Sequence, residues 1–119
     1  MKVYIPLNEE GIKELEECQE EETKNLKIIE FSKDDYFYLE RKKYLDFLNI
    51  ECGVLIDLYE DENIPYNKLN NAIDITKILR DNSSEERFVN LANKFIDIFK
   101  LAKECNTYVN IYCYGDPNA

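Results

Sequence analysis

Alternating apolar and polar positions mark three short segments of the chain as strands. In the first segment Val3, Ile5 and Leu7 fall on one face, which is the period of two expected of a half-buried strand. Pro6 interrupts this segment, so the strand is expected at a sheet edge or to end early. Strands are predicted over residues 2–7, 26–31 and 107–114, and residues 54–59 could form either a short buried strand or an extended loop.

A helical spacing of apolar residues predicts four helices. The strongest pattern runs from Phe88 to Cys105, where large apolar side chains form one broad face. Asn8 is a favourable N-cap for the first helix, and Ser83 with Glu86 has the spacing of a capping box for the last. The predicted helices cover residues 9–22, 37–49, 66–81 and 84–105.

The order of these elements indicates the fold class. Strands and helices interleave, which is typical of an α+β or α/β domain, and a length of 119 residues suits one domain. We therefore expect a single domain over residues 1–119, with a small sheet of three to four strands and about four helices. Phe88, Phe95 and Phe99 are expected to hold the last helix against the sheet.

The net charge of the chain gives information about its binding partners rather than its fold. The formal net charge is −10 at pH 7, and eight glutamates crowd residues Glu9–Glu22 around a single lysine. Such a surface repels nucleic acid and anionic lipid and attracts basic proteins. The same glutamates would also serve as a solubilising helix face, so both interpretations remain open at this stage.

Catalytic and metal-binding motifs are missing from the sequence. The chain has no histidine, and its three glycines are far apart, so neither a histidine-based active site nor a phosphate-binding loop can form. The acidic stretch from Asp57 to Asn63 lacks the central glycine of a calcium loop. We expect no enzyme, no cofactor and no metal. A carboxylate-based enzyme is the remote alternative, because 25 acidic residues allow chance pairs.

The four cysteines and the N-terminal segment suggest a compartment. No two cysteines form a C-x-x-C pair, the first residues contain no long apolar stretch, and no apolar run approaches the length of a membrane span. We expect a cytoplasmic protein with free thiols and no membrane association.

Nine tyrosines suggest contact surfaces, because tyrosine combines a large apolar area with a polar tip and is enriched at interfaces. Several stand next to carboxylates, a combination that suits lysine and arginine on a partner. Ordinary core packing is the competing explanation. The candidate partner-binding residues are Glu16, Glu17, Glu20, Glu21, Asp34, Asp35, Tyr36, Tyr38, Asp57, Tyr59, Glu60 and Asp61.

One segment resembles a known family. The run Phe95–Lys103 followed by Val109–Tyr112 resembles the closing helix and strand of the barstar-like inhibitors. The Tyr-Tyr-Gly…Leu-Asp segment associated with that family's inhibitory surface has no counterpart here, so no inhibitory residue is carried over. In type, the chain resembles the small acidic immunity proteins of bacterial toxin–immunity systems.

That resemblance implies a function. An immunity protein of this type binds and neutralises a basic, nuclease-like toxin, without binding nucleic acid itself. The alternative is an adaptor or subunit of a larger assembly that uses tyrosine-rich contacts. A monomer is favoured.

Overall fold

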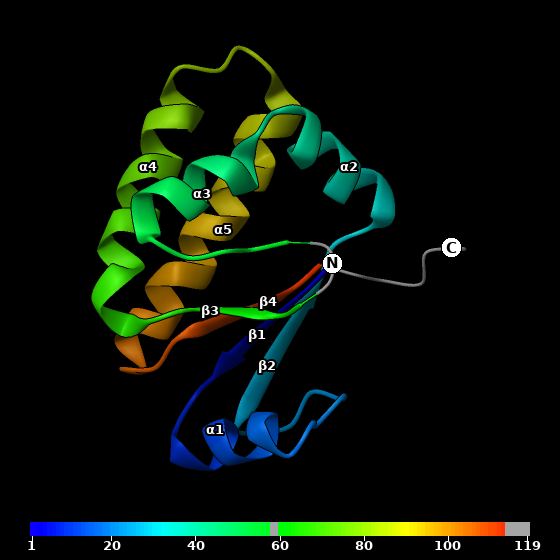
Figure 1. Ribbon diagram of the computed structural model, residues 1–119, viewed down its shortest axis with the longest axis vertical. Coiled ribbons are helices and arrows are strands. Elements are labelled where there is room, and N and C mark those ends of the chain that lie inside the picture. Colours follow the sequence, from blue (N-terminus) through cyan, green and yellow to red (C-terminus); the bar gives the residue numbers. More distant parts are fainter. Residues whose placement is uncertain (58–59, 114–119) are drawn as a thin grey trace.

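The computed structural model describes residues 1–57 and 60–113 (Figure 1). These residues form a four-stranded antiparallel sheet, in the order β2-β1-β4-β3, and five α-helices, which confirms the predicted α+β class. The elements are β1 Lys2–Pro6, α1 Glu9–Glu16, β2 Leu26–Glu30, α2 Lys33–Arg41, α3 Tyr44–Cys52, β3 Glu62–Ile64, the 3₁₀ helix η1 Tyr66–Lys68, α4 Leu69–Asp81, α5 Glu86–Glu104 and β4 Val109–Tyr112.

Strand β1 lies in the interior of the sheet, between β2 and β4, so the expected edge position is wrong. The expected early end is confirmed, because β1 stops at Pro6. Pairing with β4 covers only Lys2 to Tyr4. Pro6 lies beyond the residues that pair with β4. Its lack of an N–H group therefore removes no hydrogen bond between β1 and β4.

One face of the sheet packs against the helices. Val3, Ile5, Val109 and Ile111 are fully buried on this inner face, which Figure 1 shows covered by α3, α4 and α5. Phe95 of α5 is also fully buried. Its ring centroid lies 4.8 Å from that of Phe31, 5.0 Å from that of Tyr44 and 6.0 Å from that of Phe99. The predicted burial of Phe88, Phe95 and Phe99 is confirmed.

Helix α1 is shorter than predicted. It ends at Glu16 rather than near residue 22, and Cys18 adopts a left-handed backbone with φ 64°. Like charges four residues apart disfavour a continued helix. The chain instead turns back toward the sheet, where residues 23 and 25 hydrogen-bond to Glu14.

The predicted helix over 37–49 is two helices. It breaks at Lys43, which has φ 59°, and the first of the two begins earlier, after an N-cap at Ser32. The apolar spacing did not reveal this break, because α2 and α3 are both rich in apolar residues and each buries its own face.

Three boundaries further along the chain also differ. Strand β3, which no prediction included, begins at Glu62 in the acidic stretch and pairs with β4. Residues 54–57 form no strand, and the rest of the ambiguous segment 54–59 lies outside the described residues. The first turn of the third predicted helix is 3₁₀. Helix α5 has Glu85 as its N-cap, and the Ser83 hydroxyl accepts a hydrogen bond from the Glu85 amide, so the expected capping box does not form.

Candidate partner-binding surface

The second face of the sheet, called the outer face below, carries the side chains that alternate with the core. Tyr4 pairs with Asn110 across β1 and β4, and with Ile28 across β1 and β2. Because side chains alternate between the faces, these three point away from α3–α5. Figure 1 shows α1 on this side of the strands, below them in the view. The outer face is therefore partly covered by α1 and the loop that follows it.

Close approach of the backbone holds α1 in place. A Cβ atom on Gly11 would lie 2.0 Å from the Asn25 carbonyl oxygen and 3.2 Å from the Cα of Pro6. The same carbonyl accepts a hydrogen bond from the Leu7 amide at 2.8 Å. Asn8 caps the helix by accepting from the Gly11 amide at 2.9 Å, which confirms its predicted role. Only glycine fits at position 11, because any side chain would collide with backbone.

The loop over residues 17–25 is tied to α1 through Glu14. One carboxylate oxygen accepts from the Thr23 hydroxyl at 2.5 Å, and the other accepts from the Asn25 side-chain amide at 3.1 Å. These hydrogen bonds, that from Thr23 first, lower the pKa of Glu14 below its ordinary value. The loop therefore has a defined course over the sheet.

This arrangement leaves four candidate carboxylates facing solvent. Glu16 ends α1, Glu17 caps it, and Glu20 and Glu21 lie in the loop. All four are exposed, and none forms an ion pair or a side-chain hydrogen bond with the residues that the structure describes. We call them the loop carboxylates. Their charge is available to a partner.

Two of the loop carboxylates and Asp61 act electrostatically on two tyrosines. Burial raises the pKa of Tyr4, and the charges of Glu20, Glu30 and Asp61 raise it further. Burial also raises the pKa of Tyr108, followed by the charges of Glu16 and Asp61. Members of two acidic patches that are separate in the sequence, Glu16 and Glu20 of the first and Asp61 of the second, therefore influence the same pair of tyrosines.

A buried amide positions Asp61. The Asn110 side chain is only 5% exposed. Its Nδ2 atom donates to the Asp61 carboxylate at 2.9 Å and to the side-chain amide oxygen Oδ1 of Asn63 at 2.8 Å. Hydrogen bonds to a charged acceptor are stronger than neutral ones. Asn110 therefore holds Asp61 and β3 at the rim of the outer face.

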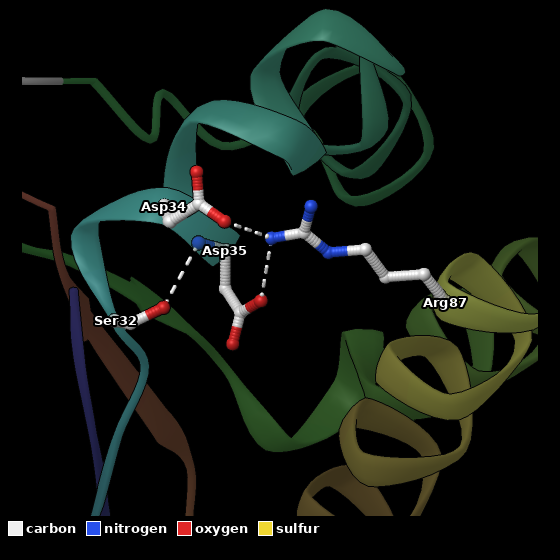
Figure 2. Close-up of polar contacts among 4 residues, drawn as sticks. All are labelled: Ser32, Asp34, Asp35 and Arg87. Atoms are coloured by element: carbon white, nitrogen blue, oxygen red, sulfur yellow. Dashed lines mark hydrogen bonds and ion pairs between the residues drawn. The ribbon is translucent and has the colours of Figure 1, made fainter.

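The predicted pair Asp34 and Asp35 lies elsewhere, and both carboxylates already share one cation within the protein. Figure 2 shows Arg87 reaching from α5 to both carboxylates at the start of α2. The Arg87 guanidinium donates to Asp34 at 2.7 Å and to Asp35 at 2.9 Å, and the hydrogen bonds to Asp35 and Asp34 raise the Arg87 pKa. The Ser32 hydroxyl accepts from the Asp35 amide at 3.0 Å and caps α2. This pair holds α2 to α5.

The neighbouring tyrosines are covered rather than displayed. Tyr36 is 7% exposed and Tyr38 6% exposed. The Arg87 guanidinium lies 4.4 Å from the centre of the Tyr38 ring. The expectation that these two rings lie on an exposed contact surface is therefore wrong. The two rings lie on different sides of α2, because residues two apart are about 200° apart around a helix, and both sides are covered; the ring between them, Phe37, is 45% exposed.

The remaining candidates lie before β3. The Asp57 carboxylate accepts from the Glu60 amide at 3.0 Å and shapes that turn, while the Glu60 side chain is exposed. Tyr59 lies outside the described residues. Of this group, Asp61 alone is placed near Tyr4 and Tyr108.

Sequence reasoning did not single out Tyr4, Tyr108 and Asn110. The signal was present in the alternation of the last strand, which put Tyr108 and Asn110 on one face and Val109 and Ile111 on the other. The sequence does not show that this strand pairs with β1. That pairing is known only from the order of strands in the sheet.

The described residues do not form a metal site or an activated thiol. No group of three or more cysteine, aspartate or glutamate side chains within 1–57 and 60–113 is placed to hold a metal ion. The four thiols are unpaired. Burial raises the pKa of Cys52 to about 11 and that of Cys113 to about 12, so both are weak nucleophiles at neutral pH. None of the described helices combines the length and apolar character needed to cross a membrane.

Comparison of the chain with protein-family models, with curated proteins and with solved structures finds no match. The functional argument therefore rests on the outer face itself.

Proposed function

We propose that the protein is a non-catalytic binding protein that recognises a basic protein through the outer face of its sheet. In its most specific form, it is an immunity protein that neutralises a nuclease-like bacterial toxin in the cytoplasm. The observation that carries this proposal is the set of four exposed loop carboxylates that have no ion pair among the described residues, two of which, Glu20 and Glu16, act on Tyr4 and Tyr108 respectively. The resemblance to small acidic immunity proteins is consistent with it.

The chemistry of a nuclease fits this surface. A nuclease must present lysine and arginine to phosphates, and carboxylates on an inhibitor can occupy the same cations. The half-buried Tyr108 adds contact area and a ring face for a guanidinium group, whereas Tyr4, only 9% exposed, lies beneath the surface. Excess negative charge also steers a basic partner and can raise association rates by about 10–10³-fold, an effect that salt weakens.

Co-expression tests the toxin form of the proposal. If the adjacent gene encodes a protein with a basic C-terminal domain, that domain is the probe and is expressed alone or together with the chain; the lack of such a gene would itself contradict the toxin form. Growth arrest by the domain alone and restored growth on co-expression are the expected results. A neighbouring domain that is not toxic, or toxicity that the chain does not relieve, would contradict the toxin form.

Charge reversal tests the surface. Glu16, Glu17, Glu20 and Glu21 are changed together to lysine, and association with the same basic domain is measured by surface plasmon resonance at 50 and 300 mM salt. The rate constant at low salt is expected to fall by about 10–10³-fold, and its salt dependence to flatten.

A matched control carries the same change in net charge. Reversing the exposed Asp46, Glu51, Asp74 and Asp97 on α3, α4 and α5 is expected to slow association much less, because these carboxylates lie on the other side of the sheet. Equal slowing by both variants would mean that total charge, and not the outer face, drives capture.

A second candidate function has its own observation. On α3 and the segment after it, Phe47 is 39%, Ile50 75% and Leu55 67% exposed, and exposed apolar side chains that gather in one region mark protein interfaces. An adaptor or assembly subunit would use this region. Light scattering after size exclusion tests self-assembly: a dimer that Ile50→Lys converts to a monomer would favour this function, and a strict monomer would exclude a homo-oligomeric subunit.

A further inference from the structure

A hollow of about 230 Å³ opens where α1 meets the start of η1 and the beginning of β4. Its apolar walls come from Ile12 on α1, Pro65 and Tyr66 before and in η1, and Tyr108 before β4. Three segments that are distant in the sequence therefore enclose one space. A hollow with mostly apolar walls accepts an aliphatic stem or a flat ring.

Two carboxylates lie near the Tyr108 side of this hollow. Glu16 follows the wall residue Ile12 by one turn of α1, so the two side chains share a helix face. The charges of Glu16 and Asp61 both act on the Tyr108 hydroxyl, and Asn110 fixes Asp61 beside Asn63, a wall residue. Glu16 has no ion pair among the described residues. An apolar space with an anionic mouth suits a side chain that is apolar along its length and cationic at its end.

We propose that this hollow seats one arginine side chain of the basic partner. The methylene stem lies against Ile12 and Pro65, and the guanidinium stacks on Tyr108 or Tyr66 while it donates to Glu16 and Asp61. Arginine fits better than lysine, because its planar group both stacks on aromatic rings and donates to several oxygens at once. The inference rests on the proposed function, to which it adds the anchor residue of the partner.

An NMR titration with a minimal probe tests the seat directly. The ¹⁵N-labelled chain is titrated with acetyl-Gly-Arg-Gly-amide and with the matched citrulline peptide, which has nearly the same shape and no charge. The amide signals of Ile12, Asn63, Tyr66 and Tyr108 are expected to shift with the arginine peptide, and at least tenfold higher citrulline peptide should be needed for the same shifts. Equal response to both peptides, or shifts confined to other residues, would overturn the proposal.

Two substitutions separate the seat from general attraction by the acidic chain. Tyr66 is 47% exposed, so Tyr66→Ala should leave the fold intact and weaken binding of the arginine peptide about tenfold. Glu16→Gln should weaken it about fivefold. Phe47→Ala, which removes an exposed ring on α3, is the control and should change nothing. A lysine peptide that binds at the same residues with equal affinity would contradict the arginine assignment.

The same variants distinguish failure of this inference from failure of the proposed function. In complex with the basic toxin domain, Tyr66→Ala is expected to speed dissociation about tenfold with little change in association, because short-range contacts act mainly on the dissociation rate. Neutralisation of the toxin without any peptide shift in the hollow would remove the arginine seat and leave the proposed function standing. Binding of the arginine peptide in the hollow without neutralisation of the toxin would contradict the proposed function and leave the hollow as an arginine site.

Discussion

The two faces of the sheet are built from the same strands and differ in the polarity of the side chains that they carry. The inner face presents Val3, Ile5, Val109 and Ile111, all fully buried under helices. The outer face presents Tyr4, Tyr108 and Asn110, with the loop carboxylates and Asp61 around them. Adjacent residues of one strand thus belong to two different environments.

This difference separates stability from recognition. The inner face stabilises the fold by removing apolar area from water, at about 25 cal/mol per Å². The outer face holds charges that contribute little to the fold, because exposed ion pairs and exposed charges are weak in water. Substitutions on the inner face should therefore lower the free energy of unfolding, and substitutions on the outer face should weaken binding.

The largest effect is expected from the core of the inner side. Phe95→Ala should lower the free energy of unfolding by about 3–5 kcal/mol, because the ring is fully buried against Phe31, Tyr44 and Phe99. Urea denaturation measures it. Phe37→Ala is the matched control, and its 45% exposed ring should cost far less. A near-native midpoint for Phe95→Ala would break the assignment of this face to stability.

A smaller effect is expected where α1 docks on the outer face. Gly11→Ala should lower the free energy of unfolding by about 1–3 kcal/mol, the range typical of overpacking, since the new methyl group would collide with the Asn25 carbonyl. Thermal denaturation measures it. Lys13→Ala on the exposed side of α1 should change the midpoint little. If Gly11→Ala is neutral or stabilising, the close packing of α1 is wrong.

Glu14 gives the outer face a pH dependence. Folding lowers the Glu14 pKa from its ordinary value of 4.5, so its stabilisation is fully present above pH 4.5 and is lost as the pH falls through the lower folded-state value. The urea midpoint of the wild type should therefore exceed that of Glu14→Gln at pH 7, and the two should converge under acid. A pH-independent gap would show that the Glu14 charge is not what holds the loop.

The smallest change in stability is expected from the loop carboxylates. Reversing Glu16, Glu17, Glu20 and Glu21 to lysine should leave the free energy of unfolding within about 0.5 kcal/mol of the wild type, as for surface substitutions in general. The same variant should show the large loss of association rate described above. A strongly destabilised variant would mean that these side chains hold the fold together, and the separation of the two faces would fail.

The predictable parts of the fold were those carried by local patterns. The periodicity of Phe88–Cys105 was long and continuous, and α5 follows it closely. The glutamates after Glu16 also looked helical, but their loop depends on Thr23 and Asn25 bonding to Glu14, which no window of sequence displays. Strand β3 is only three residues long and exists because β4 is available to pair with it.

The candidate site also has a part that the sequence suggested and a part that only the structure decided. Charge and tyrosine content suggested a surface of carboxylates and tyrosines for a basic partner, which stays a prediction; in the structure the charges of Asp61, Glu16 and Glu20 act on Tyr4 and Tyr108, which were not among the candidates. Tyr36 and Tyr38 were chosen because they neighbour Asp34 and Asp35 in the chain. The fold buries the two rings and pairs the two carboxylates with Arg87, more than fifty residues away.

The sequence by itself determined the α+β class, the approximate positions of α5 and of strands β1, β2 and β4, and an excess of negative charge. These follow from composition and from short-range periodicity, which do not depend on which segments are neighbours in the folded structure. Only the tertiary structure decided which carboxylates stay unpaired and which tyrosines they surround. Burial and ion pairing are properties of neighbours in space, and here those neighbours are brought together by the order of strands in the sheet.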